Sequence, residues 1–153
     1  MRYMSTLLAV RDMAASIRFY REILGLEVIQ DFGANVTLTG GIALQTLESW
    51  REFIGGKPVA LRSHTGELYF EESDMDGFLR KLEGEDISYV HPPLEHRWGQ
   101  RVVRFYDPDG HIIEVGEDMT RVVKRFIQSG MTEEQVAERM DVPVDYVREC
   151  LRT

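Results

Sequence analysis

This 153-residue chain contains four histidines and one cysteine. These side chains readily ligate metals or act as nucleophiles or bases. No pair among the histidines has the spacing of metal ligands; they are His64, His91, His96 and His111. His111 is expected at the surface, whereas His96 is the histidine to test as a general base or substrate contact. A single cysteine, Cys150, excludes an internal disulfide and a cysteine metal cluster.

Aromatic side chains form the second group of candidates. Trp98 follows the polar segment 91–97 and precedes a predicted strand, so its indole is expected either to border a binding site or to anchor packing. Trp50 belongs to the connector 48–65, which acts either as a lid or as closure of a sheet edge. Tyr69 stands two residues after Glu67 in one predicted strand, so the two share a face and Tyr69 is a candidate pocket wall.

The elements that position these residues follow from hydrophobic periodicity. The first half predicts a strand over 5–10, a helix over 13–24 that Asp12 caps and Gly25 ends, and strands over 26–29, 35–38 and 42–47. The second half predicts a strand over 67–72, a short helix after Asp74, and strands over 87–90, 101–106 and 111–116. The same β-α-β-β-β order thus occurs twice, about 62 residues apart, which predicts an α+β fold of two modules.

The pattern becomes helical after residue 117. Helices are predicted over 121–128, 132–140 and 143–151, and Thr132 with Gln135 forms a capping box for the second of them. We therefore divide the chain into a domain over 1–117 and a C-terminal helical appendage over 118–153 that resembles a helix-turn-helix. Residues 117–153 carry six basic and eight acidic side chains, which favours packing within the chain or a dimer over DNA binding.

Composition narrows the classes of partner. Hydrophobic residues make up 43% of the chain and charged residues 29%, as in folded globular proteins. The formal net charge of -8 disfavours nucleic acid as a partner. No stretch has the length of a membrane span or the apolar core of a signal peptide, so we expect a cytoplasmic protein without a membrane partner.

Two segments of the sequence resemble a known superfamily. The first runs from Val10-Arg11-Asp12-Met13 through Phe19-Tyr20 to Leu24-Gly25-Leu26, and the second from Trp98-Gly99-Gln100-Arg101 through Asp107-Pro108-Asp109-Gly110 to Glu114. They resemble the vicinal oxygen chelate superfamily, which includes glyoxalases, bleomycin resistance proteins and extradiol dioxygenases. The resemblance implies that the two modules form a cupped mixed sheet, lined by the first, fourth, fifth and eighth strands.

The resemblance also implies where metal ligands would stand. The metal enzymes of the superfamily place one ligand on each lining strand, usually histidine, glutamate or glutamine, histidine, and glutamate. Ser5 and Glu67 occupy the two histidine positions, seven residues before Asp12 and Asp74, and Gln45 and Glu114 occupy the others. The usual site of two imidazoles and carboxylates is therefore not intact.

Two alternatives remain for the surviving oxygen ligands. In one, Gln45, Glu67 and Glu114 hold a divalent cation (Mn, Mg, Ni or Zn) completed by water. In the other, no metal or other cofactor binds, and Glu67 pairs with an arginine such as Arg101 or Arg104.

The resulting hypothesis is a glyoxalase-related protein that binds a small molecule in its cup, without the two-histidine site, and forms a homodimer. The first alternative is a divalent-metal-dependent lyase, isomerase or dioxygenase in which Glu114 is catalytic. The second alternative is a ligand-responsive regulator, in which the C-terminal helices respond to the binding of a ligand in the cup. The predicted ligand-binding residues are Ser5, Gln45, Glu67, Tyr69, Trp50, Trp98 and Arg101.

Overall fold

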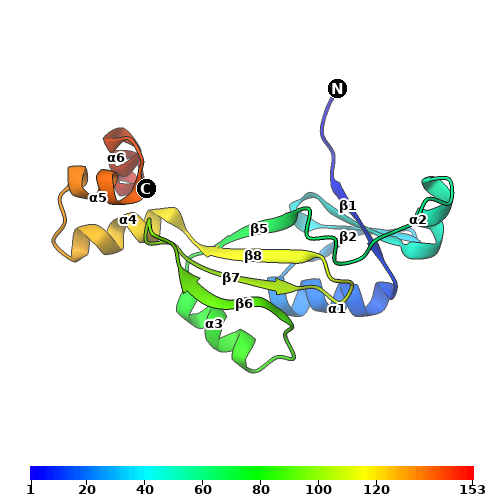
Figure 1. Cartoon of the computed structure of the whole chain (residues 1–153). Coiled ribbons are helices and arrows are strands. Elements are labelled where there is room, and N and C mark those ends of the chain that lie inside the picture. Colours follow the sequence, from blue (N-terminus) through cyan, green and yellow to red (C-terminus); the bar gives the residue numbers. More distant parts are fainter. The chain divides into compact units, whose positions relative to one another are not determined.

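A computed structural model describes all of residues 1–153 and divides the chain into two compact units (Figure 1). The first unit comprises Met1–Glu67 and Tyr106–Ile112, and the second comprises Leu68–Phe105 and Ile113–Thr153. Each unit is built around one four-stranded sheet, with strand order β1-β4-β3-β2 in the first and β5-β8-β7-β6 in the second. None of the helices combines the length and apolar character needed to cross a membrane.

The first sheet contains β1 (Thr6–Val10), β2 (Val28–Asp31), β3 (Asn35–Leu38) and β4 (Ile42–Thr46). β1 runs parallel to β4, and the remaining pairs are antiparallel. Between β1 and β2 lies α1 (Met13–Leu24), which begins where the Asp12 side chain accepts a hydrogen bond from the Ala15 amide at 2.9 Å. Gly25 ends α1 in the left-handed conformation, with φ of 68°, as a C-terminal glycine does.

The second sheet repeats this order. It contains β5 (Glu67–Glu72), β6 (Tyr89–Glu95), β7 (Arg101–Tyr106) and β8 (Ile112–Glu117), and α3 (Met75–Glu83) follows β5. Asp74 caps α3 by accepting from the Gly77 amide at 2.9 Å, as Asp12 caps α1. Phe78 of α3 packs on Phe105 of β7 with ring centroids 6.3 Å apart. The predicted α+β fold of two β-α-β-β-β modules is confirmed.

The turn between β7 and β8 binds the first helix of the first unit. Asp107, which is buried, accepts a hydrogen bond from the Tyr20 hydroxyl at 2.8 Å and another from the His111 imidazole at 2.8 Å. Asp109, also buried, pairs with Arg11 at 2.7 Å. His111, which was expected at the surface, is half-buried: the carboxylate of Asp107 holds its ring against the turn, and 23% of its side chain is exposed.

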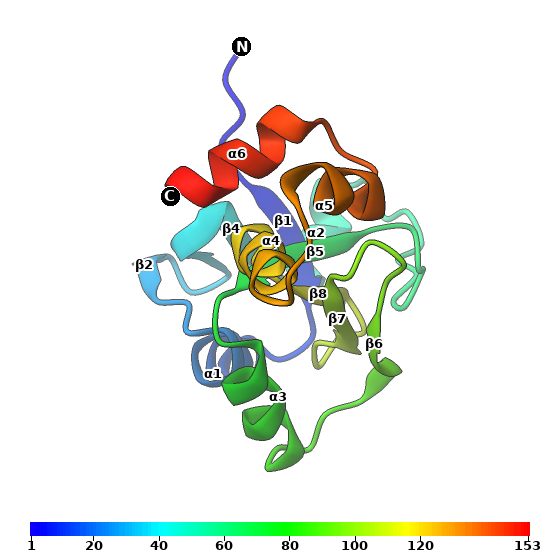
Figure 2. The same cartoon turned by 90° about the vertical axis from the view of Figure 1, so that its left-hand side faces the viewer.

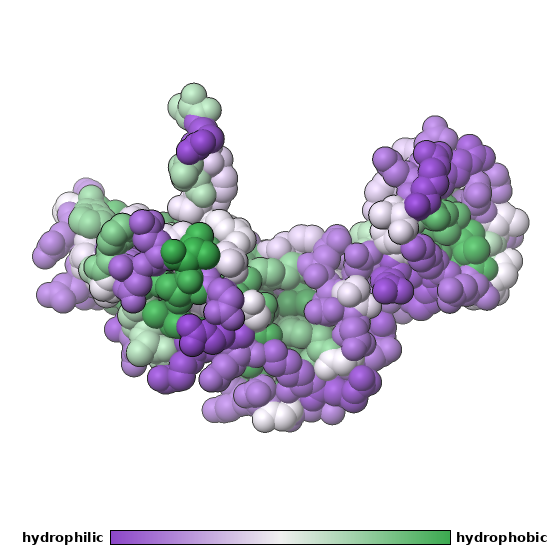
Figure 3. Space-filling view, turned by 180° about the vertical axis from the view of Figure 1, so that it is seen from behind, coloured by the Kyte–Doolittle hydropathy of each residue, from purple (hydrophilic) through white to green (hydrophobic).

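The C-terminal segment forms three helices, α4 (Met119–Gln128), α5 (Glu133–Met140) and α6 (Val144–Arg152) (Figure 2). The predicted capping box is present, since Thr132 and Gln135 each bond the other's backbone amide. These helices bury a hydrophobic cluster of their own, with Val122 and Val147 fully buried. In Figure 3 they lie on the right, where the visible surface is mainly hydrophilic and carries one hydrophobic strip.

The structure departs from the predicted elements in two places. The connector contains α2 (Leu47–Phe53), which carries Trp50 and contacts β1 and β4. β6 continues to Glu95, so His91 lies in a strand and not in a loop. The helices share a compact unit with the second sheet. A domain boundary at residue 117 stays a prediction.

Candidate functional site

Gln45 lies in the middle of the first sheet, on β4, and is 3% exposed. Its amide oxygen accepts a hydrogen bond from Asn35 at 2.8 Å, and its amide nitrogen donates to Ser49 at 2.6 Å. Ala9 is paired with Gln45 in the sheet, and strand alternation assigns Ser5 to the same face as Ala9. Ser5, just before β1, and Trp50 of α2 are both half-buried.

The second sheet has one hydrophobic and one polar face. Ile113 and Val115 of β8 are buried together with Phe105, which α3 covers through Phe78. The intervening residues, Glu114 and Gly116, point to the opposite face because side chains alternate along a strand. We call this the polar face; it carries Glu114 and Gly116 on β8, Arg104 on β7, His91 on β6, and Tyr69 on β5.

An ion pair occupies the centre of the polar face. The guanidinium of Arg104 binds the carboxylate of Glu114, whose side chain is 7% exposed. On its other side, Nη1 of Arg104 lies 3.3 Å from Nε2 of His91. His91 and Arg104 stand opposite each other in the β6–β7 pairing. His91, Arg104 and Glu114 therefore form a row across three adjacent strands.

A chain of directed hydrogen bonds runs beside this row. The indole nitrogen of Trp98 donates to Oε1 of Gln100 at 3.2 Å, and Nε2 of Gln100 donates to the Tyr69 hydroxyl at 2.9 Å. Tyr69 in turn donates to Glu71 at 2.9 Å. Gly116 makes room for this arrangement, because a Cβ there would lie 2.6 Å from Nε2 of Gln100.

Tyr69 is a neutral phenol at physiological pH. Partial burial raises its pKa to about 12; the hydrogen bond from Gln100 acts in the opposite direction, and Glu71 adds to the rise. Its side chain is nevertheless accessible, with the residue 49% exposed. Tyr69 therefore offers a ligand an aromatic ring and a hydroxyl rather than a phenolate.

Trp98 lies in the loop between β6 and β7 and contacts the C-terminal helices. Its ring stacks on His96 with centroids 4.1 Å apart and planes 18° apart, and it packs against the hydrophobic cluster of α4–α6. Burial lowers the pKa of His96, and the electrostatic influence of Arg104 and His91 lowers it further. A cavity of about 680 Å³ adjoins Trp98, lined also by Arg97, Glu138, Arg139, Met140 and Asp141.

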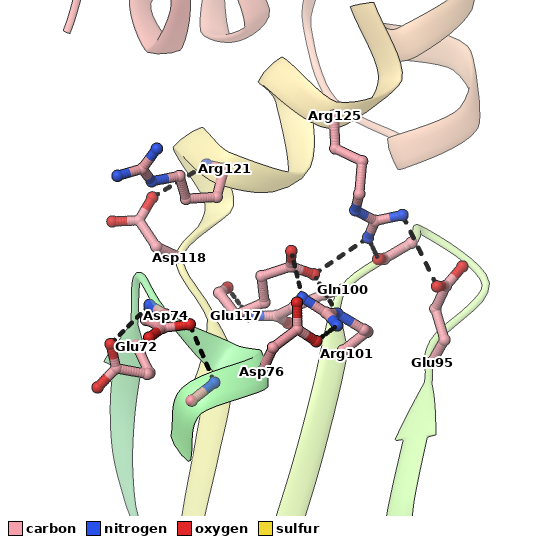
Figure 4. Close-up of polar contacts among 12 residues, drawn as sticks. Glu72, Asp74, Asp76, Glu95, Gln100, Arg101, Glu117, Asp118, Arg121 and Arg125 are labelled. Atoms are coloured by element: carbon pink, nitrogen blue, oxygen red, sulfur yellow. Dashed lines mark hydrogen bonds and ion pairs between the residues drawn. The ribbon is translucent and has the colours of Figure 1, made fainter. Parts of the chain in front are cut away.

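Arg101, which we grouped with the ligand-binding residues, is engaged elsewhere. Its guanidinium binds Asp76 of α3 at 2.5 Å and both carboxylate oxygens of Glu117, each at 3.1 Å (Figure 4). Arg125 of α4 also binds Glu117, at 3.0 Å. Arg101 thus links the sheet to α3 and α4, and we do not include it in the candidate site. Glu67, the first residue of β5, is exposed and lies on the same face of the strand as Tyr69.

The residues at the superfamily's ligand positions do not fit a two-histidine metal centre. Ser5 and Glu67 supply a hydroxyl and a carboxylate where imidazoles are expected, and the amide of Gln45 is bonded to Asn35 and Ser49. The carboxylate of Glu114 is bound by a guanidinium. No group of three or more histidine, cysteine, aspartate or glutamate side chains has the arrangement of a metal site.

Tyr69, Trp98 and Glu114 were predicted from the sequence, and their roles stay predictions; the contacts of Gln100 with Tyr69 and of His91 with Arg104 were not predicted. Gln100 was quoted only as part of a motif, and its hydrogen bond to Tyr69 joins positions 31 residues apart in the sequence. His91 was assigned to a loop, so its pairing with Arg104 had no signal in the sequence.

Comparisons with known proteins agree with the fold. The glyoxalase-like domain family matches residues 3–120. A protein of unknown function from Agrobacterium tumefaciens has a crystal structure that superimposes with a TM-score of 0.69, at 39% identity over 77% of this chain and 94% of that one. A lactoylglutathione lyase from the same organism gives a TM-score of 0.57 at 26% identity, over 76% and 92% of the two chains. The uncharacterized protein YraH of Bacillus subtilis is 26% identical over 124 residues, which are 75% of this chain and 97% of YraH.

Proposed function

Because this chain belongs to the glyoxalase-like domain family, we propose that it binds a small molecule at the polar face of its second sheet without the two-histidine metal site. The ligand lies against Tyr69 and Trp98. Its class is a planar or aromatic small molecule, since an aromatic ring and an indole are typical walls of such sites. We also propose that the protein forms a homodimer and resides in the cytoplasm.

The observation that carries this proposal is the ion pair between Arg104 and Glu114. Glu114 stands at a position where the superfamily's metal enzymes have a ligand. A carboxylate that is bound by a guanidinium and largely buried is already charge-compensated. A divalent ion at Glu114 would have to displace that guanidinium and would meet its positive charge at close range.

Thermal melting of chelator-treated protein, alone and with Mn, Mg, Ni or Zn, tests the metal-free part of the proposal. We expect unchanged melting with each ion, because an ion stabilises the fold only if it binds the folded state. A rise with one ion that disappears in Glu114→Gln would instead support the lyase, isomerase or dioxygenase alternative.

Tryptophan fluorescence tests the location of the ligand. Planar aromatic compounds that raise the melting temperature are titrated into the wild type, Trp98→Phe and Trp50→Phe, which each retain one aromatic ring at the altered position. We expect the ligand-induced change in emission to persist in Trp50→Phe and to vanish in Trp98→Phe. The opposite pattern would move the site to α2, and no stabilising compound in the screen would count against a binding role.

A further inference from the structure

The row of His91, Arg104 and Glu114 places a positive charge between two groups that commonly ligate metals. Imidazole nitrogen and carboxylate oxygen are both standard ligands of divalent transition metals. Here each faces a different terminal nitrogen of the same guanidinium, Nη1 toward His91 at 3.3 Å and Nη2 toward Glu114. The guanidinium thus sits where a cation would bridge the two side chains.

The hydrogen bonds fix the proton of His91. Nδ1 lies 2.8 Å from the carbonyl oxygen of Pro92, and because a carbonyl oxygen only accepts, Nδ1 must carry the proton. The guanidinium only donates, so Nε2 of His91 must be the acceptor of the Arg104 contact. His91 therefore presents an unprotonated Nε2 toward Arg104, which is the form of histidine that binds metals.

The strand pairing keeps the three side chains in this order. His91 and Arg104 are directly paired on β6 and β7, and β7 lies next to β8, which carries Glu114. All three project from one face of adjacent strands, whose spacing is about 5 Å. Any residue at position 104 therefore lies between two side chains that can ligate a metal, His91 and Glu114.

We propose that the Arg104 guanidinium is the resident cation of the polar face, held by His91 and Glu114 in the place that a divalent ion would otherwise take. This inference rests on the proposed metal-free function and explains it. An arginine is charged at every physiological pH and needs no metal supply. It offers hydrogen bonds but no open coordination position, so it orients a ligand oxygen without acting as a Lewis acid.

The test replaces the Arg104 guanidinium with a side chain that can ligate a metal. Arg104→His puts an imidazole between His91 and Glu114 and completes a set of two histidines and one carboxylate, a set that binds divalent transition metals. We expect this variant to bind one Co²⁺ or Ni²⁺ per chain by calorimetry, to give the visible absorption of protein-bound Co²⁺, and to melt higher with either ion. The wild type should show none of these responses.

Two matched variants locate the metal. Adding His91→Asn to Arg104→His should weaken the metal affinity at least tenfold, and so should adding Glu114→Gln, because each removes one ligand. Arg104→Met, which removes the charge without adding a ligand, should bind much more weakly than Arg104→His. If Arg104→His does not fold, Arg104→Gln replaces it, with an amide oxygen as the third donor and the same dependence on His91 and Glu114.

The outcomes separate this inference from the proposed function. A folded Arg104→His that binds no Co²⁺ or Ni²⁺, or whose binding ignores His91→Asn and Glu114→Gln, overturns the resident cation while the binding function still stands. Metal binding by the wild type with equal affinity overturns both. A failed ligand screen combined with metal binding by Arg104→His overturns only the proposed binding function.

Discussion

Both carboxylate oxygens of Glu117 accept hydrogen bonds from Arg101, each at 3.1 Å, in a two-pronged pair at the end of β8. The Glu117 side chain is 5% exposed and Arg101 is 30% exposed, so the pair is largely shielded from water. Arg125 of α4 adds a third hydrogen bond, and the pair thereby joins the sheet to the C-terminal helices (Figure 4).

Glu117→Gln should lower the free energy of unfolding by about 3 kcal/mol, because it leaves two arginines facing a neutral amide in a buried place. Urea denaturation at pH 7 measures this. Glu95→Gln is the matched control: Glu95 is exposed and lies 3.8 Å from Arg125, so its loss should cost less than about 1 kcal/mol. Equal losses in the two variants would mean that burial of Glu117 adds nothing.

Acid should destabilise the protein through two carboxylates with lowered pKa values. Burial alone would raise the pKa values of Asp107 and Glu117, but hydrogen bonds from His111 and Tyr20 to Asp107, and from Arg101 and Arg125 to Glu117, lower them below their ordinary 3.8 and 4.5. A depressed folded-state pKa gives stability that is present above the ordinary value and is lost as the pH falls through the folded-state value.

We therefore expect the free energy of unfolding to be nearly constant from pH 7 to pH 5 on account of these two groups, and to fall below about pH 4. Urea denaturation at a series of pH values checks this. Glu117→Gln should fall less steeply than the wild type between pH 4 and pH 2, because it has one fewer group to protonate. A parallel fall in both proteins would remove Glu117 from the acid response.

The order of elements was predictable because it depends on local signals. Asp12 and Asp74 cap equivalent helices, Gly25 ends the first of them, and the capping box of Thr132 lies within four residues of sequence. The site was less predictable because its contacts join distant segments. His91 contacts Arg104 because of the register in which β6 and β7 pair. The face on which Arg101 lies depends on where β7 begins, and a shift of one residue in that start moves the side chain to the other face.

Gln100→Met should lower the free energy of unfolding by about 2 kcal/mol and shift the emission of Trp98. Gln100 is 5% exposed and bonds Trp98, Tyr69 and the Glu117 carbonyl, and methionine fills similar space without these bonds. Denaturation and fluorescence measure the two effects. Gln30→Met, at an exposed position, is the control that should change neither, and unchanged Trp98 emission in Gln100→Met would show that Gln100 does not position the indole.

Gly99 precedes Gln100 and lets α4 approach the loop that carries Trp98. Its φ is +89°, and a Cβ there would lie 2.1 Å from the tip of the Phe126 ring, closer than any unstrained contact. Arg125 reinforces the approach by donating to the Gly99 carbonyl at 2.5 Å. An added methyl group therefore meets both an unfavourable backbone conformation and a ring held by the helix.

Gly99→Ala should consequently lower the free energy of unfolding by about 3 kcal/mol, of which about 1 kcal/mol is backbone strain and the rest is displacement of Phe126. Gly33→Ala isolates the strain, because Gly33 has a similar φ of +76° and nothing within 4 Å of its added Cβ. Gly99→Ala should cost less when it is added to Phe126→Leu than when it is added to the wild type, because the Phe126 ring is then absent. Equal costs for Gly99→Ala and Gly33→Ala in urea denaturation would mean that the contact between Phe126 and the Trp98 loop is too loose to couple the helices to the site.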